Sequence, residues 1–164
     1  MRLTADICDE NEKEIEEGSV QILSLPLRMY GKRPHISGEV VTVKAIEDNS
    51  LIRKTIEQDG ENKILVVDGA GSQKCALMGG ALGALAKKNG WQGAIIYGCI
   101  RDSQELLQLE LGVWAVGTSP LRSKKLNVGL VNTRITIANC SVISGNYCVA
   151  DSDGVLFSKK NIVD

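Results

Sequence analysis

An arginine and an aspartate stand side by side directly after a short apolar run, and their side chains could do chemistry. The run covers residues 95–100, and Arg101 and Asp102 follow it. Arginine offers a rigid fork of donors that suits a carboxylate or an oxo group. Aspartate is a hard oxygen ligand that suits Mg²⁺, which often takes few protein carboxylates and keeps its waters. A structural role is the alternative, since such a pair can also cap a helix or form a salt bridge.

Glycines precede this pair in two groups. Gly69 and Gly71 follow an apolar run, whereas Gly79 and Gly80 fall within the helical spacing of residues 75–89. Glycine weakens a helix interior, so the second group could mark the true start of that helix, with free N–H groups directed at a carboxylate. Alternatively, these two glycines only allow close packing of helix and sheet. Neither G-x-G-x-x-G nor the G-x-x-x-x-G-K-[ST] phosphate loop is present, so the pattern gives no nucleotide fingerprint.

The surrounding pattern alternates strands and helices in the middle of the chain and changes to strands alone near the end. The predicted strands are 38–47, 63–68, 93–97, 113–116, 134–138, 141–143 and 154–157. The predicted helices run from Thr4 as cap to about 17, from 49 or 50 to a stop at Gly60, from 75 to 89 and from 103 to 108. This order predicts a layered α/β domain with both parallel and antiparallel pairing. Ligands of such sheets tend to lie beyond the carboxyl ends of the strands.

Length and composition favour one globular domain over residues 1–164. Hydrophobic residues make up 43%, charged residues 24%, and the net charge is −1. Because there is no basic excess to hold a polyanion, direct nucleic-acid binding is not expected. No apolar run approaches the roughly 20 residues of a membrane helix. The acidic N-terminal segment lacks a signal-peptide core, so we expect a cytoplasmic protein without a membrane partner.

The metal-binding residue types other than carboxylates are sparse. The five cysteines show no CxxC spacing, and His35 is the one histidine. A zinc site is therefore poorly supported, and we expect reduced, mostly buried thiols. His35 lies in a polar segment and is expected at a surface or an interface rather than in catalysis.

Three further groups of charged residues have mainly structural interpretations. Asp68 could bond the amides of the glycine loop or lie near a metal, and we favour the first role. Asp151 and Asp153 are expected to fix a turn, because aspartate bonds its own backbone there. The 119–129 loop is expected to be a solvated face, although its basic residues could attract an anionic substrate. These basic residues are Arg122, Lys124 and Lys125.

Together these segments resemble the family of regulator of ribonuclease activity A (RraA-like), which includes 4-hydroxy-4-methyl-2-oxoglutarate aldolases. The likeness covers nearly the whole chain. The matching stretches are 38–44, 47–49, 64–69, 90–93, 98–102 and 149–155. The G-x-x-R-D element of residues 98–102 is specific when a glycine-bearing helix start precedes it.

The resemblance implies a β/β/α swivelling fold, a homotrimer that is sometimes doubled to a hexamer, and a pyruvate site. In that site Asp102 would bind Mg²⁺, or another divalent cation such as Mn²⁺, and Arg101 would contact the pyruvate oxygen. The backbone amides that would hold the pyruvate carboxylate are those of Gly79, Gly80, Ala81 and Leu82. The implied activity is a metal-dependent (class II) lyase that cleaves 4-hydroxy-4-methyl-2-oxoglutarate-type substrates to pyruvate and also decarboxylates oxaloacetate.

The same resemblance leaves a second function open. Some members are non-catalytic regulators that bind and inhibit a ribonuclease E-type enzyme. Those members lack a complete arginine–aspartate pair, and this chain keeps it, which favours catalysis. Gly80 and Ala81, however, replace polar or acidic residues that many members place there. Methyl transfer in menaquinone synthesis, also attached to the family by name, is not expected, because no segment resembles a methyl-donor site.

Overall fold

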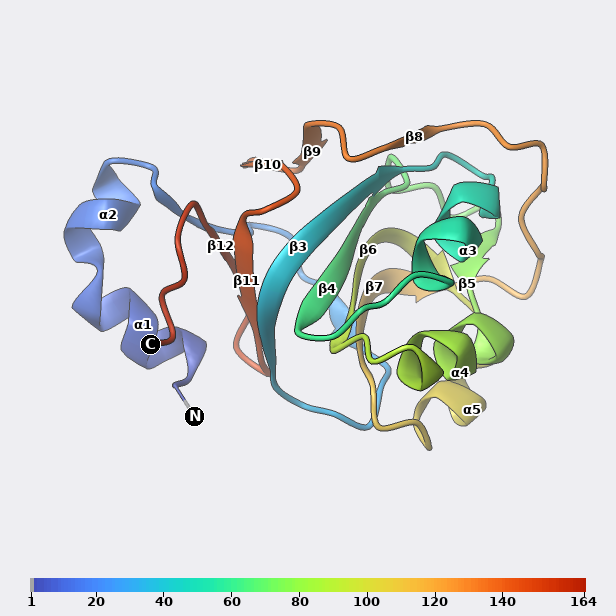
Figure 1. Cartoon of the computed structure of the whole chain (residues 1–164), viewed down its shortest axis with the longest axis horizontal. Coiled ribbons are helices and arrows are strands. Elements are labelled where there is room, and N and C mark those ends of the chain that lie inside the picture. Colours follow the sequence, from blue (N-terminus) through green and yellow to red (C-terminus); the bar gives the residue numbers. More distant parts are fainter. Residues whose placement is uncertain (1) are drawn as a thin grey trace.

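A mixed sheet carries the fold across residues 2–164, which the computed structural model describes (Figure 1). The strands are β1 Val20–Ile22, β2 Arg28–Met29, β3 Ile36–Lys44, β4 Lys63–Asp68, β5 Ala76–Met78, β6 Gly93–Ile100, β7 Gly112–Thr118, β8 Leu130–Val131, β9 Ile135–Ile137, β10 Cys140–Val142, β11 Tyr147–Ala150 and β12 Val155–Ser158. The helices are α1 Thr4–Glu10, α2 Glu12–Glu16, α3 Ser50–Ile56, α4 Gly80–Lys88 and α5 Ser103–Leu106.

The sheet combines a parallel centre with antiparallel flanks. Its order is β1-β12-β11-β3-β4-β6-β7-β2, with β5 added to β6 and β8 added to β3, while β9 and β10 form a separate hairpin. The pairs β3–β4, β4–β6, β6–β7 and β5–β6 are parallel, and the remaining pairs are antiparallel. The predicted mixture of pairing is confirmed. Because the central strands run in one direction, their carboxyl ends share one edge.

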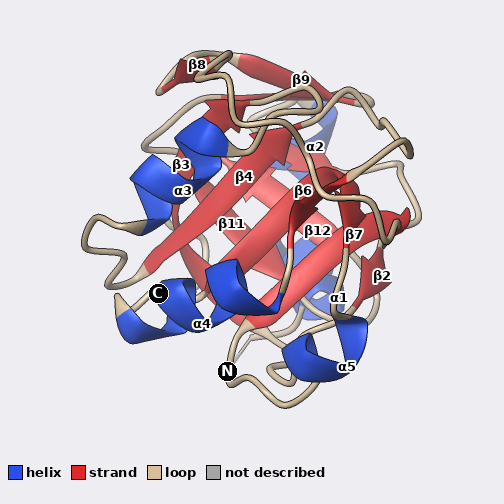
Figure 2. Ribbon diagram, turned by 90° about the vertical axis from the view of Figure 1, so that its right-hand side faces the viewer, coloured by secondary structure: helices blue, strands red, loops and turns tan. Residues whose placement is uncertain are grey.

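Two cores lie on opposite faces of the sheet, because successive side chains of a strand point to opposite sides. On β4, Leu65 and Val67 belong to the core beneath α3, α4 and α5, whereas Ile64 and Val66 belong to the second core. Residues of β9–β12 close this second core. In the 90° view, β11 and β12 lie behind the central strands β4 and β6 (Figure 2). The molecule therefore has a β/β/α layering, as predicted.

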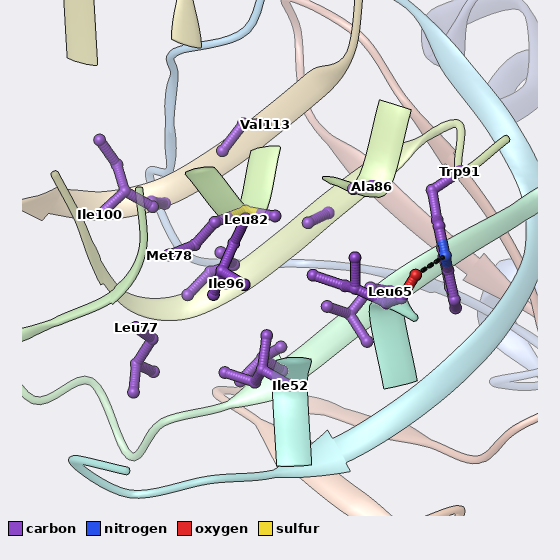
Figure 3. Packing of buried hydrophobic residues seen from close by; sticks show 14 of the residues in the cluster. Ile52, Leu65, Leu77, Met78, Leu82, Ala86, Trp91, Ile96, Ile100 and Val113 are labelled. Carbon is purple, nitrogen blue, oxygen red and sulfur yellow. Dashed lines mark hydrogen bonds between the residues drawn. The ribbon is translucent and has the colours of Figure 1, made fainter. Parts of the chain in front are cut away.

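The core on the helix side contains a tryptophan that joins three elements (Figure 3). Trp91 follows α4 and lies against α3, where its Nε1–H donates to the carbonyl oxygen of Ile56 over 3.2 Å. Gly60 leaves the room for its ring, since a Cβ at Gly60 would lie 2.2 Å from Trp91 Cγ. The packing fixes how α3 and α4 lie on the sheet.

The N-terminal segment covers the outer face of β11 and β12, on the opposite side of the sheet from α3–α5 (Figure 1). Ile7 is buried there, and the backbone N–H and hydroxyl of Thr4 both donate to the buried Asp151 carboxylate at 2.7 Å. The C-terminal end lies beside it, since Arg2 Nη1 donates to the Ile162 carbonyl over 3.3 Å.

Two helix predictions are wrong in their bounds. The predicted helix 4–17 divides at Asn11, whose backbone leaves the helical region, and Leu3 rather than Thr4 is its N-cap. The hydroxyl of Thr4 is instead used by Asp151, which is distant in sequence. The predicted helix 75–89 begins only at Gly80, because residues 76–78 form β5 and pair with the end of β6. The true helix start at the glycines is thus the alternative that the sequence left open.

Smaller differences concern the ends of elements. Strand β6 continues to Ile100, so the arginine–aspartate pair directly follows it, and α3 ends at Ile56, before Gly60. The short strands β1, β2, β8 and β11 were not predicted, because two to four residues carry too little periodicity. Among residues 2–164, no helix is long and apolar enough to cross a membrane.

Candidate active site

The arginine–aspartate pair lies beside the start of α4 because β5 and β6 end together. The two strands are parallel, with Met78 paired to Ile100, and the Arg101 N–H donates to the Met78 carbonyl over 2.9 Å. Asp102 then takes a left-handed conformation with φ of 55° and forms the N-cap of α5. Aspartate tolerates this region better than most residues do. The turn directs both side chains toward the same cavity.

The two side chains form a loose, accessible pair. Arg101 Nε lies 3.9 Å from Asp102 Oδ2, and the side chains are 41% and 40% exposed. An exposed pair at this separation contributes little to stability, so holding the fold together is a poor explanation for it. Asp102 Oδ2 also accepts the Gly80 N–H over 3.0 Å, whereas Oδ1 has no hydrogen bond within residues 2–164. One carboxylate oxygen is therefore held in place and the other is free to meet a cation.

The chemistry of the Asp102 carboxylate fits a hard cation such as Mg²⁺ or Mn²⁺. Within the part of the chain that the structure describes, no three His, Cys, Asp or Glu residues are grouped as a metal cage. A hard cation that keeps most of its waters needs only one or two protein carboxylates. Asp102, with a free oxygen at the cavity, meets that requirement.

The residues whose amides the resemblance implied lie at the start of α4. Gly79 is the N-cap, and the Gly80 N–H is already bonded to Asp102. The N–H groups of Ala81 and Leu82 have no acceptor among residues 2–164, so they remain free for a carboxylate. A Cβ at Gly79 would lie 2.6 Å from Asp102 Oδ2, so glycine is needed where the pair meets the helix.

One cavity of about 390 Å³ brings these residues together. Its volume falls within the range of small-molecule sites. It contains Gly79, Ala81, Leu82, Arg101 and Asp102, whereas the buried Gly80 contributes only through its bond to Asp102. The remaining residues that line it are Asn49, Ser50, Arg53, Lys54, Glu57, Ala76, Met78, Arg122, Lys125 and Asn127.

Sequence reasoning missed the wall formed by α3 and assigned no binding role to the 119–129 segment beyond attraction of an anion. The cavity is strongly cationic, since five basic side chains line it against the two carboxylates of Glu57 and Asp102. The basic residues are Arg53, Lys54, Arg101, Arg122 and Lys125. The basic loop in the sequence was the one available signal for part of this wall. The α3 residues carried no such signal, because their spacing indicates only an amphipathic helix.

The other residues considered from the sequence lie outside the cavity. Asp68 accepts the Ala70 N–H over 2.9 Å, which is the favoured structural role. Asp151 accepts the Asp153 N–H over 2.9 Å and fixes the predicted turn, while it also binds Thr4. His35 Nε2 lies 3.0 Å from the Arg2 carbonyl oxygen. None of these residues lines the cavity that contains Arg101.

The cysteines behave as the sequence predicted. All five are free thiols, and all except Cys8 are buried. Burial raises the pKa of Cys140 to about 11 and also raises the pKa of Cys148 and Cys99. These thiols stay protonated at neutral pH and are poor nucleophiles or metal ligands.

The fold and the cavity define an α/β protein whose candidate site lies at the carboxyl edge of a parallel sheet. The sequence model of the Aldolase/RraA family matches residues 4–157, and the chain belongs to this family.

Relatives of similar length support that assignment. The chain is 45% identical over 157 residues to a Dechloromonas aromatica protein, covering 96% of each, and 42% identical over 159 residues to one from Burkholderia multivorans, covering 97% of each. Both are provisionally named 4-hydroxy-4-methyl-2-oxoglutarate aldolases.

Two solved structures share the fold closely. One, from Geobacillus kaustophilus, is named as an S-adenosylmethionine:2-dimethylmenaquinone methyltransferase; it has a TM-score of 0.93, is 38% identical, and covers 98% of this chain and 96% of its own. The RNA-processing inhibitor RraA of Thermus thermophilus has a TM-score of 0.91, is 32% identical, and covers 98% of this chain and 94% of its own. The relatives and solved structures that this chain resembles thus carry names for three different functions.

Proposed function

We propose that this protein is a divalent-metal-dependent lyase that cleaves 4-hydroxy-4-methyl-2-oxoglutarate-type substrates to pyruvate and also decarboxylates oxaloacetate. The observation that carries it is the position of Arg101 and Asp102 beside free helix-start amides in one cationic cavity. The names of the bacterial relatives support the aldolase part. A purely structural pair would not need both side chains accessible at the mouth of a cavity.

Each group in the cavity would bind a different negatively charged part of the substrate. The N–H groups of Ala81 and Leu82 would bind the C1 carboxylate, and the Arg101 guanidinium would donate to the 2-oxo oxygen. As the C3–C4 bond breaks, its electron pair moves toward that oxygen and forms an enolate, while the 4-hydroxyl gives its proton to water and becomes a carbonyl. The enolate then takes a proton at C3 and leaves as pyruvate. Arg101 stabilises the enolate more than the ketone, because the negative charge develops beside it.

Decarboxylation of oxaloacetate needs the same arrangement. There the C3–C4 bond releases CO₂, and the electron pair forms the same pyruvate enolate, which is then protonated at C3. A divalent cation held through Asp102 would supply Lewis-acid stabilisation of this charge. The reaction needs no Schiff base, and the two lysines of the cavity, Lys54 and Lys125, are not required for one.

Pyruvate release from 4-hydroxy-4-methyl-2-oxoglutarate and from oxaloacetate, with Mg²⁺, Mn²⁺ or excess EDTA, tests the proposal. We expect turnover that depends on the cation and that falls by about 10²–10³ when Arg101 is changed to Gln. Asp102→Ala should lose the turnover that depends on the divalent cation. Glu110→Gln is the matched control, because Glu110 forms an exposed ion pair with Lys32 outside the cavity. Metal-independent rates, equal in parent and Asp102→Ala, would exclude this function.

A regulatory function is the second candidate, because the Thermus relative is named as an RNA-processing inhibitor. In that case the protein would bind a ribonuclease E-type enzyme without chemistry. Co-purification with the ribonuclease and inhibition of RNA cleavage would support it. Asp102→Ala should leave such inhibition unchanged.

We also propose a homotrimer, which could double to a hexamer. The 121–131 segment exposes apolar side chains beside the cavity, which is typical of a surface that another protein covers. They are Leu121, Leu126, Val128, Leu130 and Val131, with exposures of 38–64%. Light scattering of the purified protein would give the mass, and Leu126→Asp should lower it toward the monomer.

A further inference from the structure

We propose, on the basis of the lyase function above, that the cavity contains a second anion subsite in which Arg122, assisted by Lys125, binds the distal carboxylate of the substrate. The enzyme would then hold a dicarboxylic 2-oxo acid at both ends and discriminate against monocarboxylic analogues. Arg122 is a specificity-determining residue in this assignment, whereas Arg101 meets the reacting end.

Backbone contacts attach the segment of Arg122 to β5, the strand that leads to the proposed pyruvate site. Residue 122 forms a parallel bridge with Ala76 on β5, and the Ala76 N–H donates to the Leu121 carbonyl over 2.8 Å. Strand β5 leads through Met78 directly to Gly79, the cap of α4. Arg122 therefore extends from a segment that is joined to the strand carrying the proposed pyruvate site.

Lys125 is held by two contacts that flank it. The Lys124 N–H donates to the Glu47 carbonyl over 3.0 Å, and the Leu126 N–H donates to Asp48 Oδ2 over 2.5 Å. Asp48 is 3% exposed, so this carboxylate is committed to the segment. A backbone held on both sides fixes the Cα position of Lys125, whose side chain lines the cavity.

The two cations have no carboxylate partner of their own. Within residues 2–164, neither Arg122 nor Lys125 forms an ion pair, whereas Arg53 of the opposite wall pairs with Glu57 at 3.1 Å. The chain as a whole has a net charge of −1, so the cationic cavity is a local concentration of charge. One monoanionic carboxylate at the α4 start would leave most of that charge unmatched. A second carboxylate would be attracted to it.

Arginine suits the distal group for a geometric reason. Its planar fork can donate two parallel hydrogen bonds to one carboxylate, which adds orientation to charge. A substrate held by such bonds at one end and by the α4 amides at the other is oriented about its C3–C4 bond. Replacing the distal carboxylate by a methyl group would leave the Arg122 fork without a partner.

Steady-state kinetics on paired substrates test the subsite. The dicarboxylate is 4-hydroxy-4-methyl-2-oxoglutarate, and its monocarboxylic analogue is 4-hydroxy-4-methyl-2-oxopentanoate, which would give pyruvate and acetone. We expect Arg122→Gln to lower kcat/KM for the dicarboxylate by about tenfold or more, mainly through a higher KM. The kcat/KM for the monocarboxylic analogue should change by less than about twofold. Arg122→Lys should recover part of the loss, because it keeps the charge without the fork.

Lys124→Gln is the matched control. It removes the same charge from the same segment, but Lys124 does not line this cavity. Equal losses on both substrates in Arg122→Gln, or equal losses in Lys124→Gln and Arg122→Gln, would overturn the subsite. Unchanged kinetics in Arg122→Gln would overturn it as well.

Binding separates this subsite from the lyase function. If the parent protein turns over neither substrate, the lyase function fails, and calorimetric titration with 2-oxoglutarate and 2-oxobutyrate in Mg²⁺ still tests the subsite. Tighter binding of the dicarboxylate, with the preference lost in Arg122→Gln, would support it. Equal binding of the two acids, or no binding of either, would reject it.

Discussion

The backbone N–H of Gly80 donates to Asp102 Oδ2 over 3.0 Å, so the first residue of α4 and the N-cap of α5 hold each other. The helix start that presents the amides and the carboxylate that would hold the cation are thereby one unit. Moving either residue displaces the other. The contact also helps to hold Asp102 in its left-handed conformation, with φ of 55°.

Gly79→Ala tests this unit. A Cβ would lie 2.6 Å from Asp102 Oδ2 and 3.0 Å from Arg101 Cγ, so the pair must shift. Since a shift near 1 Å can cost about 10²-fold in rate, we expect a large loss of kcat with little change in thermal midpoint. The control is Gly117→Ala, whose Cβ would meet only Cys99 Sγ at 4.0 Å. Parent-like rates in Gly79→Ala would contradict the geometry.

Gly60→Ala tests the packing that fixes α3 and α4. The added Cβ would fall 2.2 Å from Trp91 Cγ, in a ring that cannot move without losing its bond to Ile56. We expect the free energy of unfolding in urea to fall by about 1–3 kcal/mol, as in other overpacked cores. Gly154→Ala, with nothing within 4 Å of its Cβ, should stay near the parent value. A stability loss of equal size in both variants would argue against this cause.

Asp151→Asn tests the attachment of the N-terminal helix. Burial raises the pKa of Asp151, but hydrogen bonds from Thr4, Asp153 and Gly154 outweigh burial and lower it. A carboxyl with a lowered folded-state pKa stabilises the fold above its unfolded pKa of about 3.9, and this contribution is lost as the pH falls through the folded value.

The parent should therefore exceed Asp151→Asn in free energy of unfolding at pH 7, by about 1–3 kcal/mol if donors are left unpaired. The difference in free energy of unfolding between the two proteins should become smaller below about pH 4. Urea titrations of both proteins over this range provide the measurement, and a gap that is constant with pH would rule out the carboxylate as its source.

Asp48→Ala tests the attachment of the segment that carries Arg122. Without the bonds to the Leu126 and Ser50 N–H groups, residues 121–129 should loosen. We expect faster tryptic cleavage there and a higher KM for the dicarboxylate than in the parent. Asp59→Ala, which removes an exposed aspartate bonded only to the nearby Glu61 N–H, is the control. Identical cleavage in both variants would show that Asp48 does not restrain the segment.

The sequence was sufficient where local pattern and tertiary structure agree. The apolar run of β4 and the strand leading to Arg101 lie where the sequence predicted them. The helix start at Gly79 and Gly80 is one of the two alternatives that the sequence left open. Residues 76–78 were wrongly assigned to a helix, because three buried apolar residues fit a helix as well as a strand. They form a strand because they pair with the end of β6, which has no other partner on that side within residues 2–164.

Long-range partners explain the remaining errors. Thr4 resembles a local helix cap, but its hydroxyl bonds to Asp151, nearly the whole chain away. Arg122 belongs to the cavity only because Ala76 and Asp48 hold its segment there, and neither contact has a signature in the order of residues. Propensity cannot report such contacts, since it depends on neighbours along the chain.

The bond from Arg2 to Ile162 brings the beginning and the end of the described chain together on the side of the sheet away from α3–α5 (Figure 1). An affinity tag or a fluorescent fusion on either end would therefore leave access to Arg101 and Asp102 open. A short linker could also join the two ends, because termini that lie close together tolerate circular permutation. Immobilising the protein through these ends would orient every molecule with its cavity toward the solution.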